Sequence, residues 1–197
     1  KIKKIRYLIK KKLLIISDST FKVFSKKIID CGLDSGVVFE LFFLSINELL
    51  NLSLKSFEKK YDYVFLYIDN RDFVNISSFD DGLLYRNVHL HEITNFYDMV
   101  LDKINKYTLA NVIISTSPDY QMNEFGNYSL KVNNSKKNLV NKFNIHIIKK
   151  AKEFNYLLFD TYSISNQIGI INFYDHQKYV LGKIPFSINF SNYFFYI

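Results

Sequence analysis

Residues 61–68 read YDYVFLYI, and this stretch decides the fold class. Aromatic and β-branched residues dominate it, which is typical of a β-strand inside a sheet. Two further apolar runs lie on either side of it along the chain, LLIIS at Leu13–Ser17 and LANVIIS at Leu109–Ser115. Continuous apolar runs of this length are typical of strands that are covered on both faces. The three runs therefore predict strands of a parallel β-sheet.

The segments between the first two of these strands also have regular patterns. Apolar residues over Thr20–Ile29 have helical spacing, and we expect Gly32 to end that helix. The run VVFELFF at Val37–Phe43 predicts another strand. Ser45 is a good N-cap for a short helix that reaches Leu50, because its hydroxyl can accept a free amide proton.

The second half of the chain repeats this alternation. A helix is predicted over Leu90–Tyr107, a polar loop over residues 117–134, and a long helix capped by Ser135. The residues YLLF at Tyr156–Phe159 predict a last, central strand. Strands that alternate with helices in this way predict parallel crossovers and a three-layer α/β/α sandwich with about five parallel strands.

Composition limits the class of protein. The chain has 197 residues, of which 48% are hydrophobic, so it can bury a core of its own and is not a disordered tail. No apolar stretch is long enough to span a membrane. A single cysteine, Cys31, excludes a disulfide framework and a zinc site built from cysteines. We expect one domain over residues 1–197, in the cytoplasm, without a metal site.

The net charge of +7 comes from 26 basic and 19 acidic residues. A basic surface can bind nucleic acid, but the lysines here are scattered. The chain is also rich in Lys, Asn, Ile, Phe and Tyr and has only two alanines, Ala110 and Ala151. This composition is typical of an AT-rich coding sequence, in which codon usage alone makes lysine common. The exception is a basic amino-terminal segment over residues 1–11. We therefore expect a solvated basic surface and no nucleic-acid partner.

The candidate site follows from the predicted topology. Ligands of open parallel sheets bind at the carboxyl ends of the strands, near the point where the strand order reverses. Polar residues follow four of the predicted strands: Ser17, Asp18, Ser19 and Thr20; Asp69, Asn70, Arg71 and Asp72; Ser115 and Thr116; and Asp160, with Asp175 and His176 further along. This edge should therefore carry the chemistry.

Ser19 is the candidate nucleophile. It lies where a strand passes into a helix, and free amide groups at a helix N-terminus can stabilise an oxyanion. The alternative is that Ser19 or Asp18 only caps the helix. His176 could activate a serine and Asp175 could orient it, although a lone Asp-His pair is also common on surfaces.

Arg71 is the main candidate for binding. A guanidinium at a strand end can hold a carboxylate or phosphate through two hydrogen bonds. Equally, it could form an internal ion pair with Asp69 or Asp72. The remaining predicted substrate-binding residues are Asp18, Thr20, Asn70, Asp72, Thr116 and Lys183. No histidine has metal-ligand spacing, and we read His89, His91 and His146 as structural or exposed.

Parts of this sequence resemble two known families. LLIISDST at Leu13–Thr20 resembles the first block of SGNH/GDSL hydrolases, in which the serine is the nucleophile. Ser17 stands in place of the family's glycine, while Asp18 and Ser19 match. DYVFLYIDNRD at Asp62–Asp72 is similar to a strand and Asp-Pro-Arg-Asp turn in the amino-terminal half of FkbH-like proteins.

The later part of the chain continues the likeness to FkbH-like proteins. A strand ends in LLFD at Leu157–Asp160, Phe173-Tyr174-Asp175 follows, and KIPFS at Lys183–Ser187 begins eight residues after Asp175. The resemblance implies a flavodoxin-like fold of SGNH-hydrolase type, no cofactor in this domain, and a covalently linked HAD-type phosphatase domain. It also implies an acyl carrier protein, or a small acyl or phosphorylated ligand, as partner, and transfer of a glyceryl-like acyl group in biosynthesis.

Three departures from the SGNH pattern leave the activity open. Arg71 falls where the pattern has a catalytic asparagine, and Lys178, not a histidine, lies three residues after Asp175. The glycine of the second block is missing after Val37–Phe43, and the HAD motif Asp-x-Asp does not occur in these residues. Three interpretations remain: an FkbH-type acyl-transfer module, an independent serine esterase or acyltransferase that uses Ser19, or an inactive structural or docking module.

Overall fold

A single all-parallel sheet forms the centre of the molecule. The computed structural model describes residues 8–52, 61–69, 71, 82–120, 125–132 and 135–188, with only the backbone of 82–89. Five strands pair in the order β2-β1-β3-β4-β5. They are β1 (Ile9–Ser17), β2 (Val37–Ser45), β3 (Tyr63–Tyr67), β4 (Asn111–Ser115) and β5 (Leu157–Phe159). This order confirms the predicted flavodoxin-like sandwich. The chain adds strands first on one side of β1 and then on the other, so the strand order reverses between β1 and β3.

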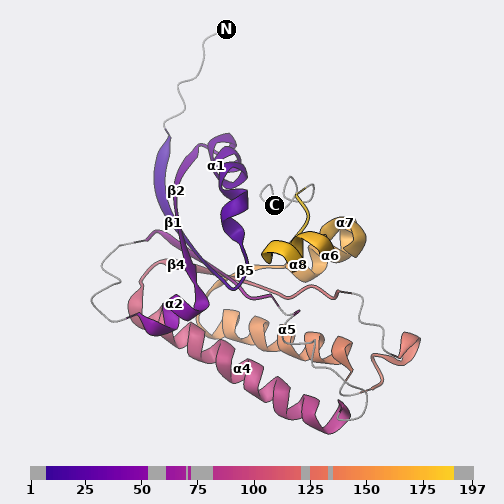
Figure 1. The fold of residues 1–197 in the computed structure, drawn as a ribbon. Coiled ribbons are helices and arrows are strands. Elements are labelled where there is room, and N and C mark those ends of the chain that lie inside the picture. Colours follow the sequence, from indigo (N-terminus) through magenta and orange to yellow (C-terminus); the bar gives the residue numbers. More distant parts are fainter. Residues whose placement is uncertain are drawn as a thin grey trace.

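Helices cover both faces of the sheet (Figure 1). One face packs against α2 (Ile46–Asn51), α4 (Gly82–Tyr107) and α5 (Lys136–Glu153). Alternate residues of the strands supply the sheet side of this core, because successive side chains of a strand point to opposite faces. Buried members of this cluster include Leu14, Ile16, Val64, Leu66, Tyr97, Leu101, Ile104, Ile114, Phe143 and Ile147.

The opposite face is more aromatic. It is covered by the short 3₁₀ helix η1 (Phe21–Phe24), by α1 (Ser25–Asp34), and by α6 (Thr161–Ile168), α7 (Ile170–Phe173) and α8 (His176–Gly182). The Phe21 ring lies edge-on to three further rings of this core at centroid distances of 5.0–5.8 Å. These belong to Phe65, Tyr67 and Phe186.

Two predicted helix starts are confirmed. Ser45 accepts the N–H of Glu48, and the Glu48 carboxylate accepts the N–H of Ser45, which makes a capping box at α2. Ser135 caps α5 by accepting the N–H of Asn138. Among the described helices, none combines the length and apolarity that crossing a membrane requires.

The predicted end of the first helix is wrong. The helix α1 continues through Gly32 to Asp34. A Cβ atom at Gly32 would lie 2.7 Å from the Phe39 ring and 2.9 Å from the Val37 carbonyl oxygen. The glycine is therefore needed because α1 approaches β2 closely, not because the helix ends there.

Two strand predictions also need correction. The strand β1 begins at Ile9, so the end of the predicted basic segment over 1–11 is part of the sheet, and Lys11 pairs with Asp62 at 2.8 Å. The strand β5 is at the edge of the described sheet rather than in its centre, and Leu157 and Leu158 are exposed there. A three-residue apolar run looks the same in either position, so sequence periodicity does not separate the two.

Candidate functional site

The carboxyl ends of β1 and β3 meet at the point where the strand order reverses. There, the Asp18 carboxylate accepts the backbone N–H of Asp69 through both oxygens, at 3.0 and 3.1 Å. Ser19 donates its hydroxyl to Asp18 Oδ1 at 3.1 Å, and its backbone N–H to Ser17 Oγ at 2.9 Å. One carboxylate thus joins the candidate nucleophile to the end of the neighbouring strand.

The alternative that Ser19 or Asp18 caps the first helix is wrong. The N-cap of η1 is Thr20 and that of α1 is Phe24, and neither helix start has a side-chain cap. Both oxygens of Asp18 instead accept the backbone N–H of Asp69, at the end of the neighbouring strand β3. Both residues are therefore available for a role at the sheet edge.

Asp18 has an altered acidity. Burial, and then the nearby negative charge of Asp69, raise the pKa of Asp18 from 3.8 to about 7. The hydrogen bonds from Asp69 N–H and Ser19 act in the opposite direction but do not cancel this effect. A carboxyl group with this pKa can both accept and release a proton near neutral pH.

We expect a comparison of the wild type with Asp18→Asn to reveal the titration of Asp18 in the free energy of unfolding. Because the pKa in the folded state exceeds the unfolded value, the folded protein binds more protons between about pH 4 and 7. The wild type should then lose stability as pH rises through this window, by at most about 1.4 kcal/mol per pH unit. Asp18→Asn should not lose stability in this way. In urea titrations, the free energy of unfolding of the variant relative to the wild type should therefore be higher at pH 8 than at pH 4.5.

Asp175→Asn is the matched control for that experiment. Hydrogen bonds from Lys178 lower the pKa of Asp175, so the stability that this group contributes is present above its unfolded pKa and is lost as pH falls. Between pH 4.5 and 8 the difference between this control and the wild type should therefore stay nearly constant, because the contribution of Asp175 is lost only below about pH 4. A difference between wild type and Asp18→Asn that stays constant from pH 4.5 to 8 would contradict the raised pKa.

Arg71 forms the internal ion pair that the sequence left as one of two alternatives. Its side chain is buried, with 3% of the residue exposed. Nε donates to Asp69 Oδ1 at 2.7 Å, and Nη2 donates to Asp69 Oδ2 and, at 3.0 Å, to the carbonyl oxygen of Pro185. Asn70 and Asp72, the predicted binding residues beside it, lie outside the described residues.

Three tyrosine rings surround the Arg71 guanidinium. Its central carbon lies 4.5 Å from the ring centre of Tyr120, 4.4 Å from that of Tyr174 and 3.4 Å from that of Tyr179. We call these the tyrosine cage. Such contacts stabilise a cation that is removed from water. Sequence analysis missed the cage, because Tyr120 lies in the predicted polar loop and the three positions meet only in the folded chain.

Three other predicted binding residues connect elements of the fold. Thr116 donates its hydroxyl to Asp160 at 2.9 Å and accepts the N–H of Tyr162, which ties β4 to the start of α6. The Thr20 N–H donates to the carbonyl oxygen of Lys183 at 2.9 Å. Lys183 itself ends α8 in the left-handed conformation, with φ of 50°.

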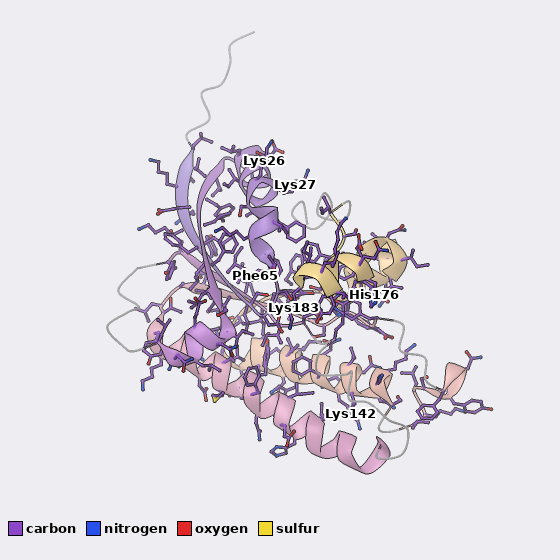
Figure 2. All side chains as sticks on the ribbon, viewed as in Figure 1. Lys26, Lys27, Phe65, Lys142, His176 and Lys183 are labelled. Carbon is purple, nitrogen blue, oxygen red and sulfur yellow. The ribbon has the colours of Figure 1, made fainter. Side chains whose placement is uncertain are left out.

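The predicted pair Asp175 and His176 lies at the start of α8. Asp175 caps this helix through the N–H of Lys178 and also forms an ion pair with the Lys178 ammonium at 3.0 Å. His176 lies exposed at the first position of α8 (Figure 2). Its Nδ1 lies 2.8 Å from the Tyr174 hydroxyl. Within the described part of the chain, the hydrogen bond of His176 goes to Tyr174 and not to Ser19.

Two of the remaining histidines have side-chain partners within the described residues. His91 lies 2.7 Å from the Asn95 amide and His146 lies 2.6 Å from Asp98, whereas the side chain of His89 is outside the description. No group of three potential metal ligands occurs where side chains are described.

A pocket of about 160 Å³ opens beside Ser19 on the β2 side of β1. Its polar lining comes from Ser17, Ser19, Thr20, Lys22, Ser45 and Glu48. Sequence analysis missed Lys22, Ser45 and Glu48 as site residues, because it assigned the start of the first helix and the end of β2 only to structural roles. Arg71, Thr116 and Asp175 are not part of this described lining. That these three residues act together with Ser19 at this edge of the sheet therefore stays a prediction.

Comparisons with known proteins identify the fold. No family model matches the chain, and no curated protein matches its sequence. A solved structure of the N-terminal part of protein BF1531 from Bacteroides fragilis, containing a phosphatase domain, is similar over 96% of this chain, with a TM-score of 0.78 and 17% identity. The present chain spans about half of that chain's length, 50%.

Esterases and a lipase are also similar. The W215I variant of Axe2, an acetylxylan esterase from Geobacillus stearothermophilus, matches with a TM-score of 0.59 and 14% identity, over 96% of this chain and 93% of its own. An extracellular lipase from Streptomyces rimosus matches with a TM-score of 0.54 and 15% identity, over 79% of this chain and 82% of its own. Two catalytic mutants of Axe2 change an aspartate and a histidine three positions apart. The chain has an SGNH-hydrolase-like α/β fold with a five-stranded parallel sheet.

Proposed function

We propose that this chain is the SGNH-hydrolase-like module of an FkbH-type protein, which assists the formation or transfer of a small, glyceryl-like acyl group to an acyl carrier protein. The observation that supports it most is the similarity over 96% of this chain to half of a chain that contains a phosphatase domain. A covalently linked phosphatase domain of HAD type belongs to the same proposal.

The site favours assistance over independent hydrolysis. Ser19 has a carboxylate partner in Asp18, but the hydrogen bond of His176 goes to Tyr174. Lys178, three residues after Asp175, is held in an ion pair with it. A serine nucleophile normally needs a base that is itself oriented by a third group, and the described residues do not arrange a histidine in that way.

The alternative function is that of a serine esterase or acyltransferase. It is favoured by one observation, the Ser19 hydroxyl 3.1 Å from Asp18, whose pKa is raised to about 7. In that case Asp18 would accept the serine proton directly. The pocket of about 160 Å³ at Ser19 would hold only a small acyl group.

Hydrolysis of p-nitrophenyl acetate separates the two functions. We expect wild type and Ser19→Ala to give the same rate, close to that of buffer. Removing the nucleophile of a working serine hydrolase lowers kcat by up to about 10⁶-fold. A wild-type rate well above buffer that Ser19→Ala abolishes would therefore replace the proposed function by the esterase alternative.

A basic groove between α4 and α5 supports the docking of an acidic carrier. The helix α5 contains six lysines and one glutamate. Lys142 and Lys149 line a groove of about 420 Å³ together with His91 and His146, and Ile145 adds an exposed apolar side chain. Figure 2 labels Lys142 on α5, next to α4. Complementary charge around an apolar centre accelerates and orients protein association.

Charge reversal in this groove tests the carrier part of the proposal. We expect Lys142→Glu/Lys149→Glu to weaken binding of a glyceryl-loaded acyl carrier protein by about tenfold, with the loss shrinking at high salt. Surface plasmon resonance would measure both. The matched control is Lys26→Glu/Lys27→Glu, which makes the same charge change on α1 (Figure 2). Equal losses in both variants would show only a general charge effect.

The same titration distinguishes transfer from mere docking. The acyl-transfer module should bind the glyceryl-loaded carrier more tightly than the unloaded carrier, because the acyl group occupies the pocket at Ser19. Equal affinity for both forms would favour the third interpretation, an inactive docking module.

A further inference from the structure

An apolar cavity of about 290 Å³ lies between the sheet and α1, next to but distinct from the polar pocket at Ser19. We propose that it binds a medium-length alkyl chain, whose polar end remains in solvent. This inference concerns a different cavity and a different ligand from the glyceryl-like group proposed above.

The walls of the cavity come from two layers of the fold. Every strand of the sheet contributes to its floor, through Leu13, Ile15, Val37, Phe39, Phe65, Ile113 and Phe159. The other wall is formed by Phe21 and by the inner face of α1 at Ile28, Cys31 and Gly32, with Ser35 at its end. Figure 2 shows Phe65 on the sheet, below α1.

The chemistry of the lining selects the ligand. No charged side chain is among its described members, and Ser35 is the one hydroxyl. An ionised group would lose its hydration there without gaining a partner, which is strongly unfavourable. The part of the ligand inside the cavity is therefore uncharged and apolar.

The size and shape of the cavity favour a chain over a compact ring. An apolar cavity of about 150 Å³ already holds benzene, and this one is about twice as large. Its lining extends from β2 to β5 across four strand spacings, each about 4.8 Å. An elongated cavity of this volume matches an extended alkyl chain of roughly eight to ten carbon atoms.

The position next to Ser19 gives the cavity a functional context. Ile15 and Phe21 line both the apolar cavity and the pocket at Ser19. The Phe21 ring is itself buried and held by neighbouring aromatic rings. The two spaces are thus adjacent but separated by these side chains, so occupancy of one does not require the other.

Calorimetric titration with saturated carboxylates tests the proposal. With hexanoate, octanoate and decanoate we expect binding of one molecule per chain, with Kd falling about fourfold for each added methylene. The gain should stop near ten carbons, when the cavity is full. Affinity that rises without limit through hexadecanoate, or an absence of saturable binding, would overturn the proposal.

Cys31 provides a second measurement, because it lines the cavity and is the only cysteine of the chain. Decanoate should slow the alkylation of Cys31 by N-ethylmaleimide at the concentration at which it binds. Ligand that binds without protecting Cys31 would place the site elsewhere and contradict the assignment.

Variants that fill the cavity complete the test. Ile113→Phe should weaken decanoate binding at least tenfold, and Val37→Phe, at the other end, should do the same if Ile113→Phe fails to fold. Ile171→Phe, at a position of α7 that is 83% exposed, is the matched control and should bind like wild type. Ser19→Ala should also bind normally, so that failure of the acyl-transfer proposal and failure of this one can be told apart.

Discussion

Arg71→Met should lower the free energy of unfolding by about 3–5 kcal/mol, the loss that follows removal of one partner from a buried ion pair. Only 3% of the Arg71 surface is exposed, and its guanidinium holds Asp69 through two hydrogen bonds. Without the guanidinium, the Asp69 carboxylate would remain buried without its counter-charge. Urea titration at pH 7, followed by circular dichroism, would measure the change.

Two further variants make this result specific. Lys11→Met breaks the partly exposed ion pair with Asp62 at the surface and should leave stability nearly unchanged. Asp69→Asn/Arg71→Met should recover part of the loss, since no unpaired charge is left inside. If Arg71→Met is as stable as wild type but binds phosphorylated acids more weakly, Arg71 is a binding residue and its ion pair is incidental.

The sequence predicted the layers of the fold because each layer depends on local patterns. Continuous apolar runs in Leu13–Ser17 and Tyr61–Ile68 marked strands that are covered on both faces, and β1 and β3 form there. The helices capped by Ser45 and Ser135 followed from side chains within three residues of the helix start. Patterns of this range need no knowledge of distant contacts.

The site depended on contacts that no local pattern contains. The sequence placed Asp18 and Ser19 at a strand end, but the bond from Asp69 N–H to Asp18 joins residues 51 positions apart. The same holds for Arg71 and the Pro185 carbonyl, which are 114 positions apart. Residue types at strand ends therefore gave the position of the site, while the choice between capping, ion pair and catalysis required the folded chain.

The KIPFS stretch at Lys183–Ser187 shows how such distant contacts build the site. Lys183 accepts the N–H of Thr20, and Pro185 accepts a hydrogen bond from Arg71. Ser187 donates its N–H to the Phe173 carbonyl oxygen. These hydrogen bonds connect the end of the described chain to the carboxyl edge of β1 and β3. Phe186, within the same stretch, is part of the aromatic core.

Phe186→Ala should therefore destabilise both the core and the site, with an expected loss of about 3–5 kcal/mol in the free energy of unfolding. Phe186 is fully buried, stacks on Phe24 at 4.6 Å and meets Phe21 edge-on at 5.6 Å. The cavity left by the ring would lie beneath the backbone that holds Arg71. Leu181→Ala, at a position 88% exposed, is the control and should change stability by less than about 0.5 kcal/mol. Equal unfolding midpoints for the two variants in urea would show that KIPFS does not anchor this edge of the sheet.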